Sequence, residues 1–196
     1  MVGRRMRRVG VYCGSSDRVD PMMLDAARAF GALLASRGVG TVYGGGRVGL
    51  MGALADGALA AGGEVLGVIP EQLMAHELGH EGCTELFVVA GMHARKMMMA
   101  SLADAFVALP GGYGTMEELF EVLTWTQLEL HRKPVGLLDV GGYYHHLRAW
   151  VAHAVASGFV RPLHAELLVC DDDPARLLDR LATVDLPGID AWIRDR

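Results

Sequence analysis

The residues of this 196-residue chain best suited to chemistry stand in a glycine-rich string, Pro110-Gly111-Gly112-Tyr113-Gly114-Thr115-Met116-Glu117-Glu118. Glycine lets the backbone turn tightly and approach a ligand closely, and the free N–H groups at the start of a following helix attract an anion. Thr115 and Glu118 have the spacing of a capping box. The string therefore predicts a phosphate site at the loop, with Glu118 in the first turn of the next helix.

Glu118 is the candidate for proton transfer or electrostatic stabilisation. In the first turn of a helix the dipole favours the ionised carboxylate, so we expect the pKa of Glu118 to lie below its usual value. Such a group is a poor general acid at neutral pH, but it can act as a base or face a developing cation. A purely structural capping role is the alternative.

Two more glycine-containing segments are predicted to follow strands at the same edge of a sheet. Cys13-Gly14-Ser15-Ser16 follows the first predicted strand, and Gly44-Gly45-Gly46 follows the second. Ligands in open parallel sheets bind beyond the carboxyl ends of the strands. Ser16, Gly45 and Gly46 are therefore candidates for phosphate contacts, with a simple tight turn as the alternative for each loop.

Arg95 and Lys96 open the helix expected before the fifth strand. Cations near a helix N-terminus oppose the helix dipole, so their position indicates an anionic partner such as a phosphate or a carboxylate. A solvated surface pair is the alternative.

Two motif matches point to other chemistry. The segment 44–49 fits GxGxxG, but it follows the second strand, whereas a dinucleotide fingerprint normally follows the first strand of its unit. His76-Glu77-Leu78-Gly79-His80 matches the zinc motif HExxH, but the surrounding segment is short and contains glycines, unlike the long helix on which that site depends. We expect neither NAD nor a metal.

Short apolar runs alternate with helix-length amphipathic stretches, which is typical of a parallel sheet covered by helices on both faces. We predict an α/β protein with a Rossmann-like doubly wound parallel sheet of about seven strands, forming a single domain over residues 1–196. The predicted strands are Val9–Cys13, Val39–Tyr43, Glu64–Ile69, Leu86–Val89, Ala105–Leu109, Pro134–Leu138 and Leu167–Val169. The predicted helices run from Pro21, capped by Asp20, up to Gly38, and over about Gly49–Ala61, Met92–Ala103, Thr115–Leu130, Tyr143–Ser157 and Pro174–Ala182, the last capped from Asp171–Asp173.

Composition excludes several classes of function. A net charge of −5 opposes binding along a nucleic acid, because duplex binding needs many cations on one face. No apolar run approaches the roughly 20 residues of a membrane helix, and Met1–Arg8 lacks a signal-peptide cleavage site. We therefore expect a cytoplasmic protein that binds neither nucleic acid nor membrane. Lys96 and Lys133 are its two lysines, which leaves few candidates for pyridoxal phosphate chemistry.

Taken together, these segments resemble the signature of the Lonely Guy phosphoribohydrolases, a family long mislabelled as lysine decarboxylases. The most specific parts are the PGGxGTxxE string and Met92–Lys96, and the likeness covers about Val9–Val160. It also takes in Val11–Ser16, Tyr43–Gly46, Val48–Gly52, Gly67–Pro70, Thr124–Leu128 and Lys133–Leu138. One departure is Glu129, at a position where many members have glycine.

The resemblance implies hydrolysis, without a cofactor, of the N-glycosidic bond of a nucleoside 5′-monophosphate to a free base and ribose 5-phosphate. The substrate would be AMP or an N6-modified AMP such as a cytokinin riboside monophosphate. Homodimers with sites near the interface are usual in the family, so we expect a homodimer. Arg95 and Glu118 match the catalytic pair, and the matched substrate contacts are Glu77, Arg95, Lys96, Gly112, Tyr113, Gly114, Thr115, Met116, Glu117, Glu118 and Thr124.

We expect cleavage to pass through a cationic sugar that Glu118 stabilises and whose attacking water it can activate, while Arg95 orients substrate and carboxylate. The chief alternative is a non-enzymatic nucleotide-binding or carrier protein, because loops that hold phosphate bind as readily as they catalyse. The preferred base and the role of the segment after Val160 stay open.

Overall fold

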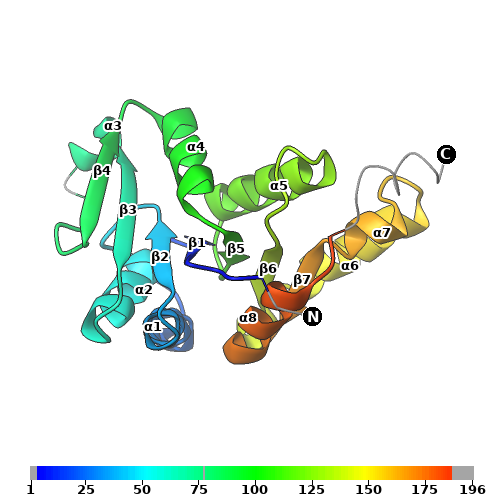
Figure 1. Ribbon diagram of the computed structural model, residues 1–196, viewed down its shortest axis with the longest axis horizontal. Helices are drawn as coiled ribbons and strands as arrows, with labels where there is room; N and C mark the ends of the chain where they lie inside the picture. The colour runs from blue at the N-terminus through cyan, green and yellow to red at the C-terminus, as the bar shows by residue number, and fades with distance from the viewer. Residues whose placement is uncertain (1–3, 77, 187–196) are drawn as a thin grey trace.

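The structure, a computed structural model, describes residues 4–76 and 78–186 and contains one parallel sheet (Figure 1). Its seven strands are ordered β4-β3-β2-β1-β5-β6-β7. Their bounds are Arg8–Tyr12 (β1), Gly40–Tyr43 (β2), Val65–Pro70 (β3), Glu85–Val89 (β4), Ala105–Ala108 (β5), Val135–Leu138 (β6) and Leu168–Asp171 (β7). The order reverses at β1, which pairs with β2 on one side and β5 on the other. The predicted α/β class is confirmed, and ligands bind at such a switch point.

Helices cover both faces of the sheet. Three helices lie on one face, namely α1 (Pro21–Ser36), α2 (Gly49–Ala60) and α8 (Pro174–Thr183). The other face carries α4 (Met92–Leu102), α5 (Tyr113–Gln127) and α6 (His145–Ala156). Successive strand residues point to opposite faces, so Val11 and Tyr12 of β1 enter different core clusters. The inner strands β2, β3, β5 and β6 are buried along their whole length, which explains their largely apolar sequences, whereas the edge strand β4 is partly exposed.

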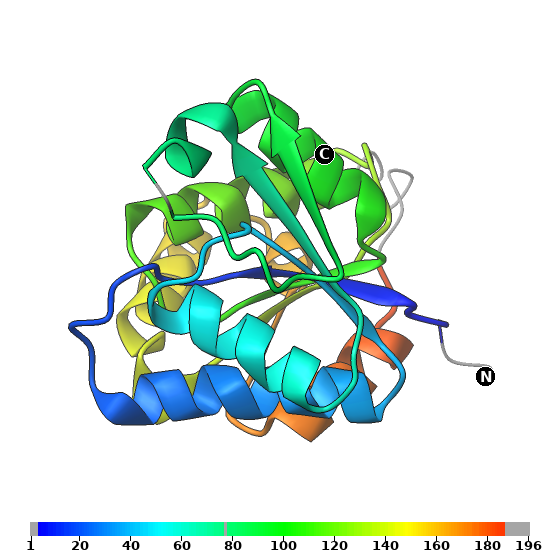
Figure 2. The ribbon, with the colours of Figure 1, turned by 90° about the vertical axis from the view of Figure 1, so that its left-hand side faces the viewer.

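The predicted helix caps at Asp20 and Asp173 are confirmed. The Asp20 carboxylate accepts a hydrogen bond from the Met22 N–H at 2.9 Å, and Asp173 accepts one from the Arg176 N–H at 2.7 Å. Each is followed by proline at the first helical position, whose ring suits that turn. The helix so fixed at Pro21 lies side by side with α2 (Figure 2).

Three short elements went unpredicted: α3 (Glu71–Met74), α7 (Pro162–Ala165) and a 3-10 turn at Val140–Gly142. Each is three or four residues long. Elements of this length show too little of a 3.6-residue period to be recognised from sequence. Among the described residues no helix combines the length and apolar character needed to cross a membrane.

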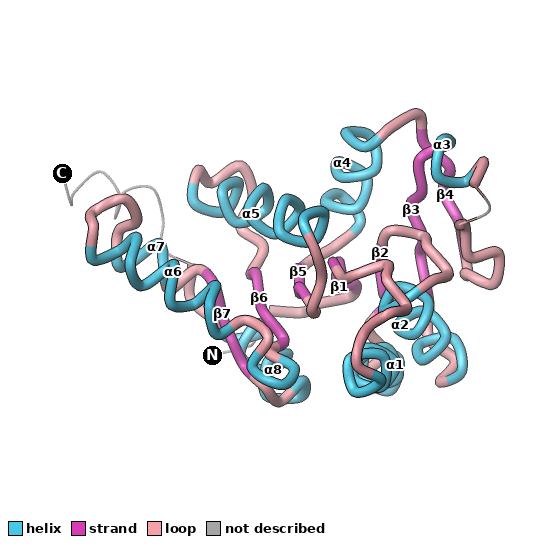
Figure 3. The backbone as a smooth tube through the Cα atoms, turned by 180° about the vertical axis from the view of Figure 1, so that it is seen from behind, coloured by secondary structure: helices cyan, strands magenta, loops and turns pink. Residues whose placement is uncertain are grey.

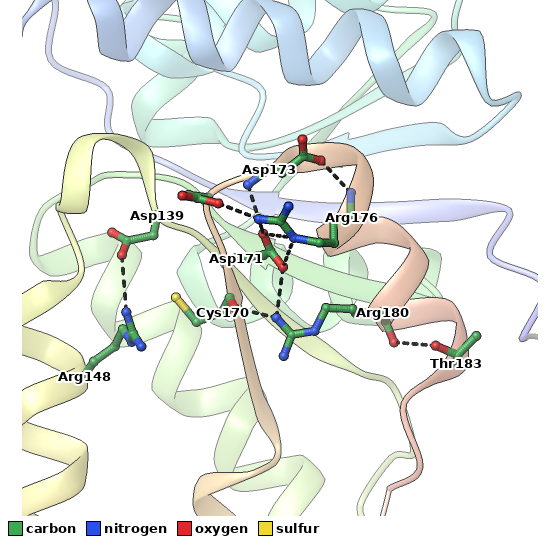
Figure 4. A network of polar contacts seen from close by, with 9 residues as sticks. Asp139, Arg148, Cys170, Asp171, Asp173, Arg176, Arg180 and Thr183 are labelled. Carbon is green, nitrogen blue, oxygen red and sulfur yellow. Dashed lines mark hydrogen bonds and ion pairs between the residues drawn. The ribbon is translucent and has the colours of Figure 1, made fainter.

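Helix α8 is fixed by ion pairs at the carboxyl end of β7 (Figure 4). The buried Asp171 carboxylate accepts hydrogen bonds from Nε of Arg176 at 2.9 Å and Nη1 of Arg180 at 3.0 Å. The bond to Arg176, ahead of that to Arg180, holds the pKa of Asp171 well below its usual range. This network anchors α8 on the last strand.

Candidate active site

Three loops meet at the carboxyl ends of β1, β2 and β5. The Gly14 N–H donates to the Pro110 carbonyl at 3.0 Å, and the Met51 N–H donates to the Gly14 carbonyl at 3.3 Å. A cavity of about 460 Å³ is bordered by the first and third loops, with Ser15, Ser16, Gly111 and Gly112 in its lining. A second cavity of about 220 Å³ is lined by Ser15, Gly44, Gly46 and Arg95 among others. Ser15 borders both, so the two cavities are neighbours.

The loop between β5 and α5 presents donors to an anion because its carbonyl groups are already occupied. Oη of Tyr144 donates to the Leu109 carbonyl at 2.5 Å, Gly14 to that of Pro110, and Oη of Tyr143 to that of Gly111 at 2.6 Å. The first N–H groups of a helix have no partner within the helix. The α5 N-terminus therefore offers backbone donors, while the nearby carbonyl dipoles are engaged elsewhere.

The predicted capping box is wrong. Helix α5 begins at Tyr113, and Gly112 is its N-cap without a side-chain hydrogen bond, so Thr115 is the third helical residue. Glu118 consequently lies in the second turn rather than the first. The glycines carry the chain into the helix three residues earlier than the Thr-Glu spacing indicated, with Gly112 rather than Thr115 as the N-cap. No threonine hydroxyl therefore accepts a hydrogen bond from the first-turn N–H groups of α5, and these groups are available to a ligand.

Arg95 and Glu118 form a buried pair between α4 and α5. Nη2 of Arg95 lies 3.5 Å from Oε1 of Glu118. Glycine at position 44 leaves room for this guanidinium, because a Cβ atom there would collide with Nη2 of Arg95 in its present position. Nε of Arg95 is buried without a hydrogen-bond partner among the described residues, which indicates a place for a ligand. Arg95 and Lys96 are both buried, so the alternative that they form a solvated surface pair is wrong.

Burial raises the pKa of Glu118 to about 7, against the opposing effect of the Arg95 charge. The expected lowering of this pKa is therefore also wrong. The helix dipole acts mainly within the first turn, and desolvation of a buried carboxylate disfavours its charged form. At neutral pH Glu118 is present in both protonation states, so it can accept or release a proton there.

Lys96 faces α5. Its Nζ donates to Oε1 of Glu117 at 2.5 Å and to Oε1 of Glu121 at 3.0 Å. The hydrogen bond to Glu117 raises the pKa of Lys96, while burial lowers it. Neither of the two cavities is lined by Lys96. The ammonium ties α4 to α5 and so keeps the neighbouring Arg95 and Glu118 opposite each other.

The other residues predicted to contact the substrate differ in how far they are buried. Thr115 is buried, and Gly112 lines the larger cavity. Tyr113 is 97% exposed, and Thr124 lies on the surface of α5 with its hydroxyl donating to the Phe120 carbonyl. Gly114, Met116 and Glu117 lie on the first turns of the same helix, Met116 half-buried and the other two exposed. Glu77 lies outside the described residues.

Sequence reasoning missed several residues of the site. Ser15 had a signal, since it adjoins Ser16 in the first glycine loop. Tyr143 and Met23 also line the larger cavity, and Leu73 and Leu78 line the smaller one. Leu78 is a variable position of the HExxH match, and the other three residues belong to no motif. Tertiary packing brings them to the site, although Gly141 and Gly142, both with positive φ, mark a tight turn just before Tyr143.

The HExxH match lacks the helix that a zinc site of that type requires. Helix α3 ends at Met74, so His76 and His80 do not lie one turn apart on a common helix. Nε2 of His80 instead lies 3.0 Å from Oδ1 of Asp56. The described residues hold no cluster of metal-ligating side chains.

A family model described as "Possible lysine decarboxylase" matches residues 51–181. The chain is 51% identical to the probable cytokinin riboside 5′-monophosphate phosphoribohydrolase LOGL9 of Oryza sativa subsp. japonica, over 90% of this chain and 78% of that protein. It is 48% identical to the cytokinin riboside 5′-monophosphate phosphoribohydrolase LOG7 of Arabidopsis thaliana, over 90% of this chain and 82% of that protein.

Solved structures share the fold at lower sequence identity. The molybdenum cofactor carrier protein MCP from Chlamydomonas reinhardtii superposes with a TM-score of 0.69 at 23% identity, covering 90% of this chain and 98% of that one. The molybdenum cofactor binding protein from Rippkaea orientalis gives a TM-score of 0.67 at 23% identity, covering 96% and 98%. At such identity the likeness concerns the fold alone.

Proposed function

The chain belongs to the Lonely Guy family of phosphoribohydrolases, and from this premise we propose that it hydrolyses the N-glycosidic bond of a nucleoside 5′-monophosphate. AMP or an N6-modified AMP such as a cytokinin riboside monophosphate is the substrate, and a free base and ribose 5-phosphate are the products. The observation that carries the proposal is the buried Arg95–Glu118 pair, of which Arg95 lines the smaller cavity and Glu118 lies on the helix whose N-terminus borders the larger one.

The substrate is placed by matching its parts to the chemistry of the site. The 5′-phosphate binds the N–H groups of Gly112–Thr115, which have no partners within the helix. Glu118 is about 4.5 Å along the helix axis from Thr115, a distance that the ribose can bridge. The base occupies the smaller cavity, whose lining includes the apolar side chains of Met51, Ile69 and Leu78. Ser16, Gly45 and Gly46 complete the proposed phosphate loops.

Hydrolysis then follows from the carboxylate of Glu118. As the bond from C1′ to the base breaks, positive charge develops on the sugar and the ionised carboxylate stabilises it. A water forms the new C1′–O bond and gives one proton to Glu118, while the departing base takes a proton from the solvent. Glu118 then returns its proton to the solvent, and the carboxylate is regenerated. Burial raises the pKa of Glu118 to about 7, and the charge of Arg95 limits this rise and orients the carboxylate. A useful fraction of the carboxylate is therefore ionised at neutral pH.

The remaining matched residues complete the proposed substrate set. Tyr113, Gly114 and Met116 stand near the phosphate on the first turns of α5. Lys96 and Glu117 are already paired with each other, and Thr124 lies farther along the same helix. Glu77 is retained as a contact to the base or sugar. We propose that all of these residues contact the substrate directly.

We include a homodimer in the proposal because large apolar side chains are exposed on the α4–α6 side. These are Met97, Leu128, Leu130, Trp150 and Phe159. Trp150 of α6 meets Phe120 of α5 edge to face, with ring centroids 5.6 Å apart. An exposed surface of this kind is typical of a protein–protein contact. It would bring the Thr124 side of each α5 near the partner.

One domain over residues 1–196 and a cytoplasmic location are also proposed. A single sheet contains every described strand. Cys13, Cys83 and Cys170 are unpaired, which suits a reducing compartment.

Pyridoxal phosphate chemistry does not fit the residues present. Of the two lysines, Lys96 is held by Glu117 and Glu121, and Nζ of Lys133 donates to the Ala100 carbonyl at 2.5 Å. Neither lines the two cavities. The Schiff-base lysine that the description of the family model would require is therefore not available at this site.

A product assay tests the proposed function. Wild-type protein is incubated with AMP and with N6-prenylated AMP, and the base and ribose 5-phosphate are quantified by chromatography. We expect the two products in equal amounts from at least one substrate, without added cofactor. Tight binding with no product would instead establish a nucleotide carrier, and release of carbon dioxide from lysine would restore the decarboxylase description.

A further inference from the structure

The smaller cavity is bordered by the segment that follows β3. Leu73 of α3 and Leu78 line this cavity together with Gly44 and Arg95. We call residues 71–76 and 78–82 the α3 segment. It lies beside β3 and β4 at one edge of the sheet (Figure 3), and no residue of its short helix is buried. The α3 segment therefore needs other attachments to hold Leu78 in place.

Backbone hydrogen bonds join the α3 segment to the second glycine loop. The Arg47 N–H donates to the Leu78 carbonyl at 2.9 Å, and the His80 N–H donates to the Gly45 carbonyl at 2.9 Å. Between these bonds Gly46 and Gly79 form an antiparallel bridge. The position of Leu78 is thus linked to the glycine loop on one side and to His80 on the other.

The His80 side chain attaches the α3 segment to α2. Its Nδ1 accepts a hydrogen bond from the Gly82 N–H at 3.1 Å, so Nε2 carries the proton and donates to Oδ1 of Asp56 at 3.0 Å. Among the described residues of the α3 segment, this is the one side-chain hydrogen bond to another element. The imidazole is 14% exposed, whereas the Asp56 side chain is 54% exposed. Both ring nitrogens are occupied, so His80 is neither a free base nor an available metal ligand.

We propose that His80, anchored on Asp56, is a positioning residue that holds Leu78 at the smaller cavity and thereby sets the affinity for the base of the substrate. This inference rests on the proposed function, in which that cavity receives the base. His80 touches neither substrate nor reacting atoms and acts through Leu78, which lines the smaller cavity. Arg95 and Glu118 are held by α4 and α5. Loss of the His80–Asp56 hydrogen bond therefore leaves the chemical step in place.

The test uses two variants that break the pair, His80→Ala and Asp56→Ala. With AMP as substrate, we expect KM to rise about tenfold in either variant, the effect of one net hydrogen bond, while kcat stays within about twofold of wild type. Asp56→Asn keeps an acceptor oxygen for Nε2 and should recover most of the affinity. Arg28→Ala is the matched control, since it removes the other partner of Asp56, 3.9 Å away, and should leave KM unchanged.

Binding measurements separate this proposal from the proposed function. In calorimetry without turnover, His80→Ala should weaken the binding of free adenine and leave that of ribose 5-phosphate unchanged. Equal weakening of both ligands, unchanged adenine binding, or parallel falls in kcat and affinity would each overturn the positioning role. A wild-type protein that binds adenine but forms no product would refute the hydrolase, and the adenine affinity of the variants would still decide the role of His80. Because Asp56 lies on the exposed side of α2, Asp56→Ala serves if His80→Ala does not fold.

Discussion

Nη2 of Arg95 lies 3.5 Å from Oε1 of Glu118, with the two side chains 6% and 5% exposed. A buried ion pair is weak support for a fold, because desolvating both charges offsets their attraction. Here desolvation exceeds the attraction of Arg95, and the pKa of Glu118 rises to about 7. Perturbed carboxylates of this kind cluster at functional sites. The pair is therefore best understood as part of the chemistry rather than of the scaffold.

The activity should depend on pH through Glu118. The proposed mechanism needs the ionised carboxylate, whose pKa in the folded protein is about 7. We expect kcat/KM to be low at pH 6, to rise as the pH passes through 7, and to level off by about pH 8. Because the substrate phosphate also titrates, with a second pKa of about 6, AMP binding to Glu118→Gln over the same range provides the control. A profile that falls across pH 7 would identify the protonated form as the active one.

Stability should depend on pH through the same group. The pKa of Glu118 is raised from 4.5 to about 7, so the folded state holds this proton more tightly than the unfolded chain. The resulting stabilisation is fully present below pH 4.5 and is lost as the pH rises through 7, by about 3 kcal/mol in the free energy of unfolding. In Glu118→Gln this decline should disappear. Urea unfolding at pH 4.5 and pH 8 measures it, and equal declines in both proteins would contradict the raised pKa.

Lys96→Met should loosen the contact between α4 and α5. The substitution removes both hydrogen bonds of Nζ and leaves Glu117 and Glu121 one helical turn apart with like charges. We expect the free energy of unfolding of the ligand-free protein to fall by about 1 to 2 kcal/mol. Glu117→Gln keeps one acceptor and the bond to Glu121, so it should lose less. Unchanged stability in Lys96→Met would show that the ammonium does not join the helices.

Tyr143→Phe should weaken phosphate binding. Without the phenol, the Gly111 carbonyl loses its donor and can turn toward the anion. We expect Kd for ribose 5-phosphate to rise about fivefold to tenfold, the effect of one net hydrogen bond, with Kd for adenine unchanged. Calorimetry with the two products gives both values. Equal effects on both ligands, or none on ribose 5-phosphate, would disprove this role for Tyr143.

Much of the fold was predictable because its signals are local. Alternation of apolar runs and amphipathic stretches gave the seven strands, and Asp20-Pro21 and Asp173-Pro174 gave two helix starts. The end of helix α5 at Glu129 is also determined locally. Its φ is 55°, and the Leu130 N–H donates to the Trp125 carbonyl, a helix ending in which glycine is usual. The departure from glycine therefore falls at a left-handed position.

The site was predictable in its loops but not in its energetics. Glycine spacing indicated where the chain turns toward a ligand, and Arg95 and Glu118 were found from their motifs. The pKa of Glu118 was mispredicted because it depends on burial in the folded protein, which position along the helix does not reveal. Tyr143 and Asp56 were missed for a related reason, since only the folded chain brings Tyr143 to Gly111 and Asp56 to His80.

The central claim is that the Glu118 carboxylate drives cleavage of the glycosidic bond, and Glu118→Gln tests it most directly. The amide keeps the shape of the side chain but cannot ionise. With AMP under single-turnover conditions, we predict adenine release at least about a hundredfold slower than in wild type, with AMP affinity within a few-fold of wild type. Adenine released by Glu118→Gln at the wild-type rate would contradict the account.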